Sequence, residues 1–142
     1  MVRRSESERA SLRAVTSVEV PYSIACALPT LSVLDITNEV AQDVGDADTA
    51  SGIAFVSPGD GPAVVRVCER ETGFFQDVEA LLGRLVPFEH GERARLLALL
   101  LGPRTEQVPF SERRLCLGRW QRVLLVTFED SPAGDWQVTL VG

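Results

Sequence analysis

The chain closes with LCLGRWQRVLLVTFED at residues 115–130 and WQVTLVG at residues 136–142, and these two segments decide the fold. Within the first, apolar residues occupy every position from Val123 to Val126, so both faces of an extended segment over 120–128 are apolar. Such a strand is typical of the centre of a sheet that is covered on both sides. The second segment alternates apolar and polar residues, which predicts a strand with one buried face.

Helical periodicity upstream of this block predicts three helices. The first is short, is capped by Asp35 or Thr37 and ends at Gly45; the others span 73–86 and 92–101. For the longest helix the spacing predicts one buried face, made of Phe74, Val78, Leu81, Leu82 and Leu85. The Leu-rich helix 92–101 is expected to be buried on more than one side.

Short apolar segments between turn residues predict the remaining strands. They span 18–27, 52–57, 63–68, 107–110 and 114–117, with a strong turn at 58–62. The order β, α, β-β, α, α and then β to the end predicts an α+β fold with mixed or antiparallel sheets. We expect one domain over residues 15–142, preceded by a polar arm over residues 1–14 that is either flexible or a short exposed helix.

Composition excludes several functions. The 142 residues are 45% hydrophobic and carry a net charge of -6, which argues against a general nucleic-acid binder. All 14 basic residues are arginine, so Schiff-base chemistry and a P-loop lysine are excluded. Cys26, Cys68 and Cys116 lack any CxxC pair, which predicts reduced thiols in a cytoplasmic protein. The longest apolar run, 96–101, is too short to span a membrane.

Four short motifs, in order, resemble the YjbQ-like family, which is associated with secondary thiamine-phosphate synthase activity. The strongest is Leu-Gly-Arg-Trp-Gln at 117–121, which is similar to the family's L-G-T-W-Q. The others are Asp35–Val40, Gly52–Val56 and the Leu-Leu-Gly at 100–102 followed by Val108-Pro109. The resemblance spans 34–142 and implies a compact α+β protomer that assembles as a homotrimer, with pockets near the subunit contacts.

The chain departs from the family where the resemblance places its chemistry. Pro58–Pro62 stands in place of a His-Thr-Thr segment, and Arg95 stands in place of a helix histidine. Cys68-Glu69 replaces an Asn-Glu pair, and 131–135 lacks the arginines of a Gly-Pro-Arg-x-Arg run. The family's catalytic set is therefore expected to be degraded in this chain.

Six residues remain as candidates for a site. The catalytic remnants are His90, Glu69 and Asp77, and the candidate ligand-binding residues are Arg95, Trp120 and Gln121. Trp120 is expected to be buried and Gln121 to hold a turn. Because His90 is the single histidine and no cysteines are paired, neither a metal site nor a cofactor is expected.

Two functions follow from this set. The first is a trimeric homologue with a degraded catalytic site that acts as a binding or structural protein, with a small anionic ligand. The alternative is a weak or altered thiamine-phosphate synthase-type enzyme that uses His90 and nearby carboxylates.

Overall fold

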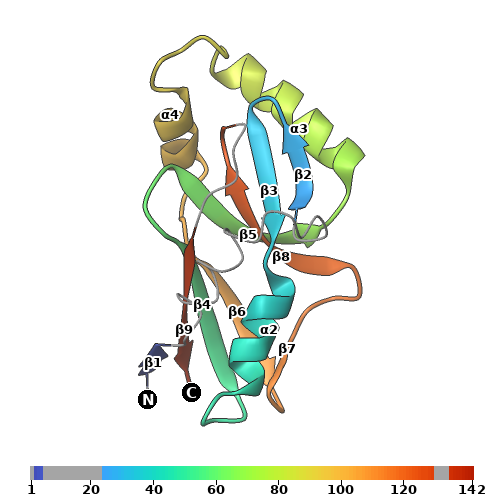
Figure 1. Cartoon of the computed structure of the whole chain (residues 1–142), viewed down its shortest axis with the longest axis vertical. Helices are drawn as coiled ribbons and strands as arrows, with labels where there is room; N and C mark the ends of the chain where they lie inside the picture. The colour runs from blue at the N-terminus through green and yellow to red at the C-terminus, as the bar shows by residue number, and fades with distance from the viewer. Residues whose placement is uncertain (1, 5–23, 130–134) are drawn as a thin grey trace.

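The computed structural model describes residues 2–4, 24–129 and 135–142 (Figure 1). Its helices are α2 (Thr37–Gly45), α3 (Thr72–Leu85) and α4 (Arg93–Leu100). Its strands are β1 (Val2–Arg4), β2 (Ile24–Leu28), β3 (Leu31–Asp35), β4 (Gly52–Pro58), β5 (Ala63–Glu69), β6 (Glu106–Ser111), β7 (Arg114–Leu115), β8 (Gln121–Thr127) and β9 (Trp136–Val141). These elements confirm the predicted α+β class in a single domain.

The strands form two antiparallel sheets. One has the order β1-β9-β4-β6-β7 and the other has the order β2-β3-β8-β5. In the first sheet β1 pairs with β9, so the two chain ends lie side by side (Figure 1). The turn at 58–62 joins β4 to β5, and these two consecutive strands belong to different sheets. The turn therefore carries the chain from one sheet to the other.

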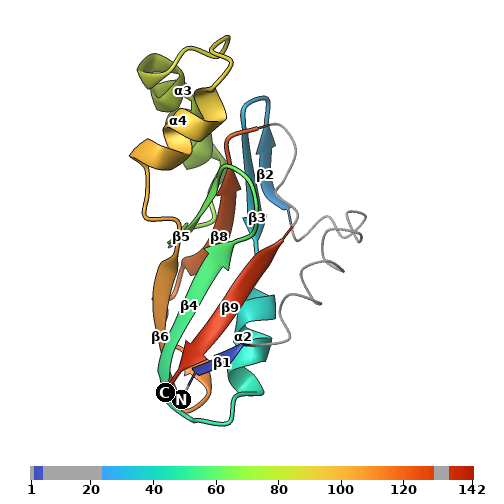
Figure 2. The same ribbon diagram turned by 90° about the vertical axis from the view of Figure 1, so that its left-hand side faces the viewer.

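Three layers result, with α3 and α4 at one end of an elongated molecule and α2 towards the other (Figure 2). One core lies between the five-stranded sheet, α2 and the face of the four-stranded sheet that carries Val123 and Leu125. A second core lies between the opposite face, with Leu124 and Val126, and the helices α3 and α4. The prediction that this strand is central and covered on both sides is confirmed, because β8 lies between β3 and β5.

The predicted buried face of α3 is partly wrong. Phe75 and Leu82 are buried, whereas Phe74, Leu81 and Leu85 are all more than half exposed. Apolar residues at neighbouring positions give this helix two overlapping stripes, and the sheet selects the stripe that begins at Phe75. The other stripe, Phe74, Leu81 and Leu85, remains on the surface.

The Leu-rich helix is also covered less than predicted. In α4, Leu97 is fully buried, but Leu99 and Leu100 are exposed. Within one chain this helix is therefore covered on one side only.

Turns and strand ends mostly follow the sequence signals. Gly45 ends α2, and Ile36, Val40 and Val44 are fully buried along one side. The turn between β6 and β7 lies at Glu112-Arg113, both with positive φ, one residue later than predicted. The strand β3 was not predicted, because Leu31–Asp35 is short and is buried along its whole length.

Other predictions lie largely outside the described residues. The predicted strand 18–27 is described only from Ile24, where β2 begins. Of the predicted arm, residues 2–4 form β1 and residues 5–14 are not described. No helix in the described parts of the chain combines the length and the apolar character needed to cross a membrane.

Candidate functional site

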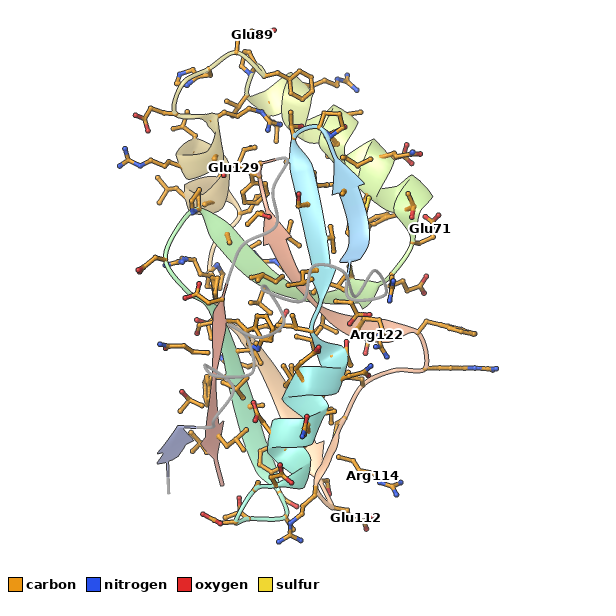
Figure 3. The ribbon with its side chains drawn as sticks, viewed as in Figure 1. Glu71, Glu89, Glu112, Arg114, Arg122 and Glu129 are labelled. Carbon is orange, nitrogen blue, oxygen red and sulfur yellow. The ribbon has the colours of Figure 1, made fainter. Side chains whose placement is uncertain are left out.

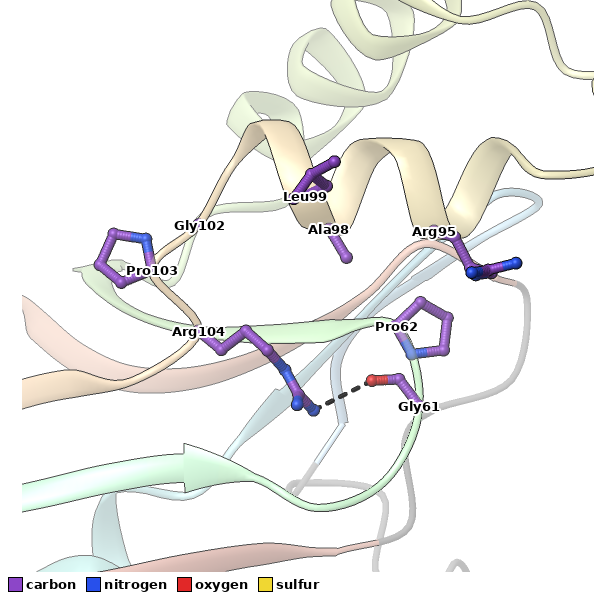
Figure 4. A pocket seen from close by; sticks show the side chains of 8 residues that line it. All are labelled: Gly61, Pro62, Arg95, Ala98, Leu99, Gly102, Pro103 and Arg104. Carbon is purple, nitrogen blue, oxygen red and sulfur yellow. Dashed lines mark hydrogen bonds between the residues drawn. The ribbon is translucent and has the colours of Figure 1, made fainter.

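The main candidate site is a pocket of about 480 Å³ beside α4, which we call the Arg95 pocket (Figure 4). It is lined by Gly61, Pro62, Arg95, Ala98, Leu99, Gly102, Pro103 and Arg104. The first two come from the turn between β4 and β5, the next three from α4, and the last three from the segment that follows α4. Most of this lining is apolar.

Arg104 fixes the turn that forms one wall of the pocket. Its Nη2 donates to the carbonyl oxygen of Gly61 at 3.0 Å (Figure 4), and its Nε donates to that of Ala63 at 3.3 Å. Gly61 has a φ of 105°, a conformation that side-chain-bearing residues rarely adopt. The guanidinium of Arg104 thus hydrogen-bonds to backbone oxygens and stabilises the turn that shapes the pocket.

Arg95 is the cation that a ligand could reach. Its Nη1 donates to Glu92 Oε2 at 2.9 Å, and both side chains are more than half exposed. Such a surface ion pair is worth about 0–1 kcal/mol, so the guanidinium is easily turned toward a ligand. Arginine offers several N–H donors to a carboxylate or phosphate but cannot transfer a proton near neutral pH. The described lining contains no histidine, cysteine or carboxylate, so the pocket favours binding over acid–base catalysis.

A second polar centre lies between the four-stranded sheet and α2 and is built on Asp35. Its Oδ2 accepts from Arg122 Nε at 2.9 Å and from Arg70 Nη1 at 3.3 Å, while Oδ1 accepts from the N–H and Oγ1 of Thr37 at 3.0 and 2.6 Å. Figure 3 shows Arg122 beside the first turn of α2. The Asp35 side chain is only 3% exposed. This group, which we call the Asp35 cluster, joins β3, α2, β8 and the end of β5, so its role is structural.

Glu39 lies at the edge of the Asp35 cluster. Its Oε2 is buried without a hydrogen-bond partner. Burial raises the pKa of Glu39, and the negative charge of Asp35 adds to this, while the residue's own backbone N–H and Arg122 act in the opposite direction. Glu39 therefore binds its proton more tightly than an exposed glutamate does.

The predicted site residues fall into two groups in space. Glu69 and Gln121 face each other in the register of β5 and β8, with Trp120 next to Gln121 in the chain. His90 and Arg95 instead lie beyond the far end of α3. Because α3 has 14 residues and therefore spans roughly 20 Å, it separates Glu69 from His90.

Asp77 lies on the exposed surface of α3, between these two groups. The three catalytic remnants thus do not converge within one chain. Among the six candidates, only Arg95 lines the main pocket.

Trp120 is not the buried residue that the sequence predicted. It is 64% exposed, and the guanidinium carbon of Arg119 lies 4.8 Å from the centre of its ring. Trp136 in β9 is the fully buried tryptophan. The prediction for Gln121 agrees with the structure, since its Oε1 accepts from the N–H of Gly118 at 2.6 Å.

Cys68 is poorly suited to nucleophilic chemistry. Burial raises the pKa of its thiol, and the charge of Glu69 adds to the effect. A thiol with a raised pKa forms little of the reactive thiolate at neutral pH. Across the described ranges, no three His, Cys, Asp or Glu side chains lie close enough together to hold a metal ion.

Sequence reasoning missed two charged groups that the fold buries. The sequence predicts Asp35 or Thr37 as a helix cap, but not that Asp35 pairs with Arg122, 87 residues away. The other is Arg93, at the start of α4, which is 5% exposed. A charged residue at the edge of an apolar strand or helix was the only available signal, and it does not identify the partner.

The model of the family described as UPF0047 protein YjbQ-like matches residues 27–141. A UPF0047 protein of Archaeoglobus fulgidus is 30% identical over 108 residues, which cover 70% of this chain and 82% of that protein.

Solved structures show the same fold. A YjbQ/UPF0047-family protein from Clostridium acetobutylicum, described as uncharacterised, is 24% identical with a TM-score of 0.66, over 82% of this chain and 98% of that one. A YbjQ-like protein of unknown function from Sulfolobus solfataricus P2 is 22% identical with a TM-score of 0.68, over 82% and 94% of the two chains.

Proposed function

Because this chain belongs to the YjbQ-like UPF0047 family, we propose that it is a non-catalytic member that binds a small anionic ligand in the Arg95 pocket. The observation that carries this proposal is the lining of that pocket. The pocket is lined by residues of the 58–62 segment and by residue 95. The resemblance implies that family members carry catalytic residues at both of these positions. In this chain the two positions bring proline, glycine and arginine in place of histidines.

The chemistry of the lining supports binding without catalysis. Losing a general acid or base commonly costs about 10²- to 10⁴-fold in rate. Arg95 retains a positive charge that suits a carboxylate or phosphate group. The apolar side chains of Pro62, Ala98, Leu99 and Pro103 suit the uncharged body of such a ligand.

The proposal includes assembly as a homotrimer. The surface of the protomer carries several exposed large apolar side chains. They are Phe74, Leu81 and Leu85 on α3 and Leu99 and Leu100 on α4. Exposed apolar patches of this kind typically mark a protein–protein interface. A second copy of the chain would cover such a surface. Light scattering should give the mass of a trimer, and a stable monomer at micromolar concentration would contradict this part of the proposal.

Ligand binding is tested by calorimetry with thiamine monophosphate as the probe, which joins a phosphate to two aromatic rings, one of them a cationic thiazolium. We expect saturable binding by the wild type, weakened about tenfold or more in Arg95→Gln, as one lost charge-assisted hydrogen bond implies. The matched control is Arg84→Gln, which makes the same charge change at an exposed position near the end of α3. Equal affinities in the two variants would exclude a role for Arg95.

The enzyme alternative is separated from this proposal by activity. We expect thiamine-phosphate synthase activity close to the detection limit in the wild type. Clear turnover that disappears in His90→Ala would instead support an altered enzyme that depends on His90, with Glu69 and Asp77 tested next by the same substitution.

A further inference from the structure

Arg93 carries a buried guanidinium that no acidic side chain of the described residues pairs with. It is the first residue of α4, and its Nε donates to the carbonyl oxygen of Val86 at 3.1 Å. Its Nη1 and Nη2 are buried and have no hydrogen-bond partner. Burial lowers the pKa of Arg93, and the charge of Glu79 opposes this effect. An unpaired buried cation is costly, and its presence calls for a missing anionic partner.

A cavity of about 310 Å³ lies beside this guanidinium, at the N-terminal end of α4. Its lining includes Thr30, Phe88, His90, Arg93 and Ala94. The backbone N–H of Ala94 belongs to the first turn of α4, where N–H groups have no partner within the helix. The N-terminal end of a helix also carries partial positive charge, which favours an anion.

His90 adds a donor of defined orientation. Its Nδ1 accepts a hydrogen bond from the backbone N–H of Glu92 at 3.0 Å. In the neutral ring the proton must then be on Nε2, which leaves Nε2–H as a donor. The residues that line the cavity therefore carry donors of three kinds: the guanidinium of Arg93, the N–H of Ala94 and the Nε2–H of His90.

We propose that this cavity binds a small oxyanion, a phosphate group either free or as a small phosphomonoester, held by Arg93, His90 and the first turn of α4. The site is separate from the Arg95 pocket and does not depend on the function proposed for that pocket. Its volume is at the lower limit for small-molecule sites, about 300 Å³, which restricts the ligand to a small one.

Two carboxylates limit the affinity. Glu79 Oε2 accepts hydrogen bonds from the N–H and Oγ1 of Thr30 at 2.7 and 2.8 Å, and Glu129 lies exposed at the rim of the cavity (Figure 3). Neither bonds to the free nitrogens of Arg93. Their negative charges weaken the binding of any anion, so we expect dissociation constants in the millimolar range.

Phe88 controls access to the guanidinium. Its ring centre lies 4.9 Å from the guanidinium carbon of Arg93, and the ring also covers Gly83, where an added Cβ would meet it at 2.3 Å. About half of the Phe88 side chain is exposed, so one side of the ring borders solvent. Binding requires it to move off the guanidinium, and Phe88→Ala should therefore bind the oxyanion more tightly.

The single histidine of the chain provides the test, because its ring signals in NMR spectra report on this cavity alone. Tag-free protein is titrated with inorganic phosphate, with glycerol 3-phosphate and with chloride at matched ionic strength. We expect saturable shifts of the His90 ring signals with one or both phosphates and none with chloride. The tighter of the two phosphates identifies the source of the oxyanion.

Variants separate this site from the Arg95 pocket. Arg93→Met should weaken the phosphate response about tenfold or more, as loss of a charge-assisted contact implies, whereas Arg95→Gln should leave it unchanged. Should Arg93→Met fold poorly, the melting temperature is measured in Arg95→Gln, with and without Phe88→Ala. A rise with phosphate but not with chloride, larger when Phe88→Ala is present, then gives the same answer. Absence of a saturable shift in both wild type and Phe88→Ala, or an equal response in Arg93→Met, would overturn the proposal.

Discussion

Replacing Asp35 by asparagine should destabilise the protein more than any other single change of charge in the described chain. The substitution keeps the size of the side chain but places an NH₂ group where Oδ2 accepts from Arg122 and Arg70. Breaking a buried ion pair in this way costs about 3–5 kcal/mol when both partners are inaccessible. The two arginine side chains are 34% and 37% exposed, so water replaces part of the lost contact. With that discount, we expect a loss of about 2–3 kcal/mol in the free energy of unfolding.

Urea denaturation measures this loss, at one fixed protein concentration because assembly affects apparent stability. With a slope of about 1–3 kcal/mol per molar, the midpoint should fall by about 1 M. The matched control is Asp77→Asn on the exposed surface of α3, which should change stability by no more than about 0.5 kcal/mol. A double-mutant cycle with Arg122→Met should give a coupling energy of at least about 1 kcal/mol. If Asp35→Asn and Asp77→Asn have equal midpoints, or the cycle shows no coupling, the structural role given to the Asp35 cluster is wrong.

Three further outcomes follow from burial and backbone geometry. Trp136→Ala should cost about 3–5 kcal/mol in denaturation experiments because the ring is fully buried, whereas Trp120→Ala should leave the stability of the protomer nearly unchanged. Gly61→Ala should lose about 1–3 kcal/mol through its φ of 105° alone, since an ideal Cβ there meets no atom within 4 Å; an unchanged melting temperature would contradict this. Glu39→Gln should stabilise the protein at neutral pH, because the raised pKa of Glu39 makes its ionisation unfavourable in the folded state. The gain in stability should vanish as the pH falls below 4.5, the ordinary pKa of a glutamate, since Glu39 is then protonated in both states. A gain that persists below that pH would refute the raised pKa of Glu39.

In α3, the spacing of apolar residues predicted the position of the helix more accurately than it predicted which face of the helix is buried. The spacing of apolar residues located this helix within one residue at each end. Of the predicted face, Leu82 is buried, whereas Phe74 and Leu81 are exposed and Phe75 is buried instead. Both stripes satisfy the helical repeat, so the choice depends on how the helix is oriented against β2 and β8, which the local sequence does not encode.

Within the candidate site, the sequence identified single residues but not their neighbours. The family resemblance predicts that Arg95 and the 58–62 segment stand where the family has histidines. That these two positions line one pocket follows only from the turn that carries the chain between the sheets. Proximity of this kind depends on contacts between distant segments.

The sequence by itself determined the α+β class, the family and the central position of β8, because each rests on local patterns: alternation, helical spacing and short motifs. The apolar run from Val123 to Val126 could be satisfied only by covering both of its faces. The tertiary structure alone decided that Asp35 meets Arg122 and Arg70. It also decided that Nη1 and Nη2 of Arg93 are enclosed without a hydrogen-bond partner among the described residues, while Arg95, two residues later, is exposed. The physical reason is that burial and charge pairing depend on which surfaces the sheets and helices bring together. The same charged residue can be buried or exposed, and paired or unpaired, depending on that packing.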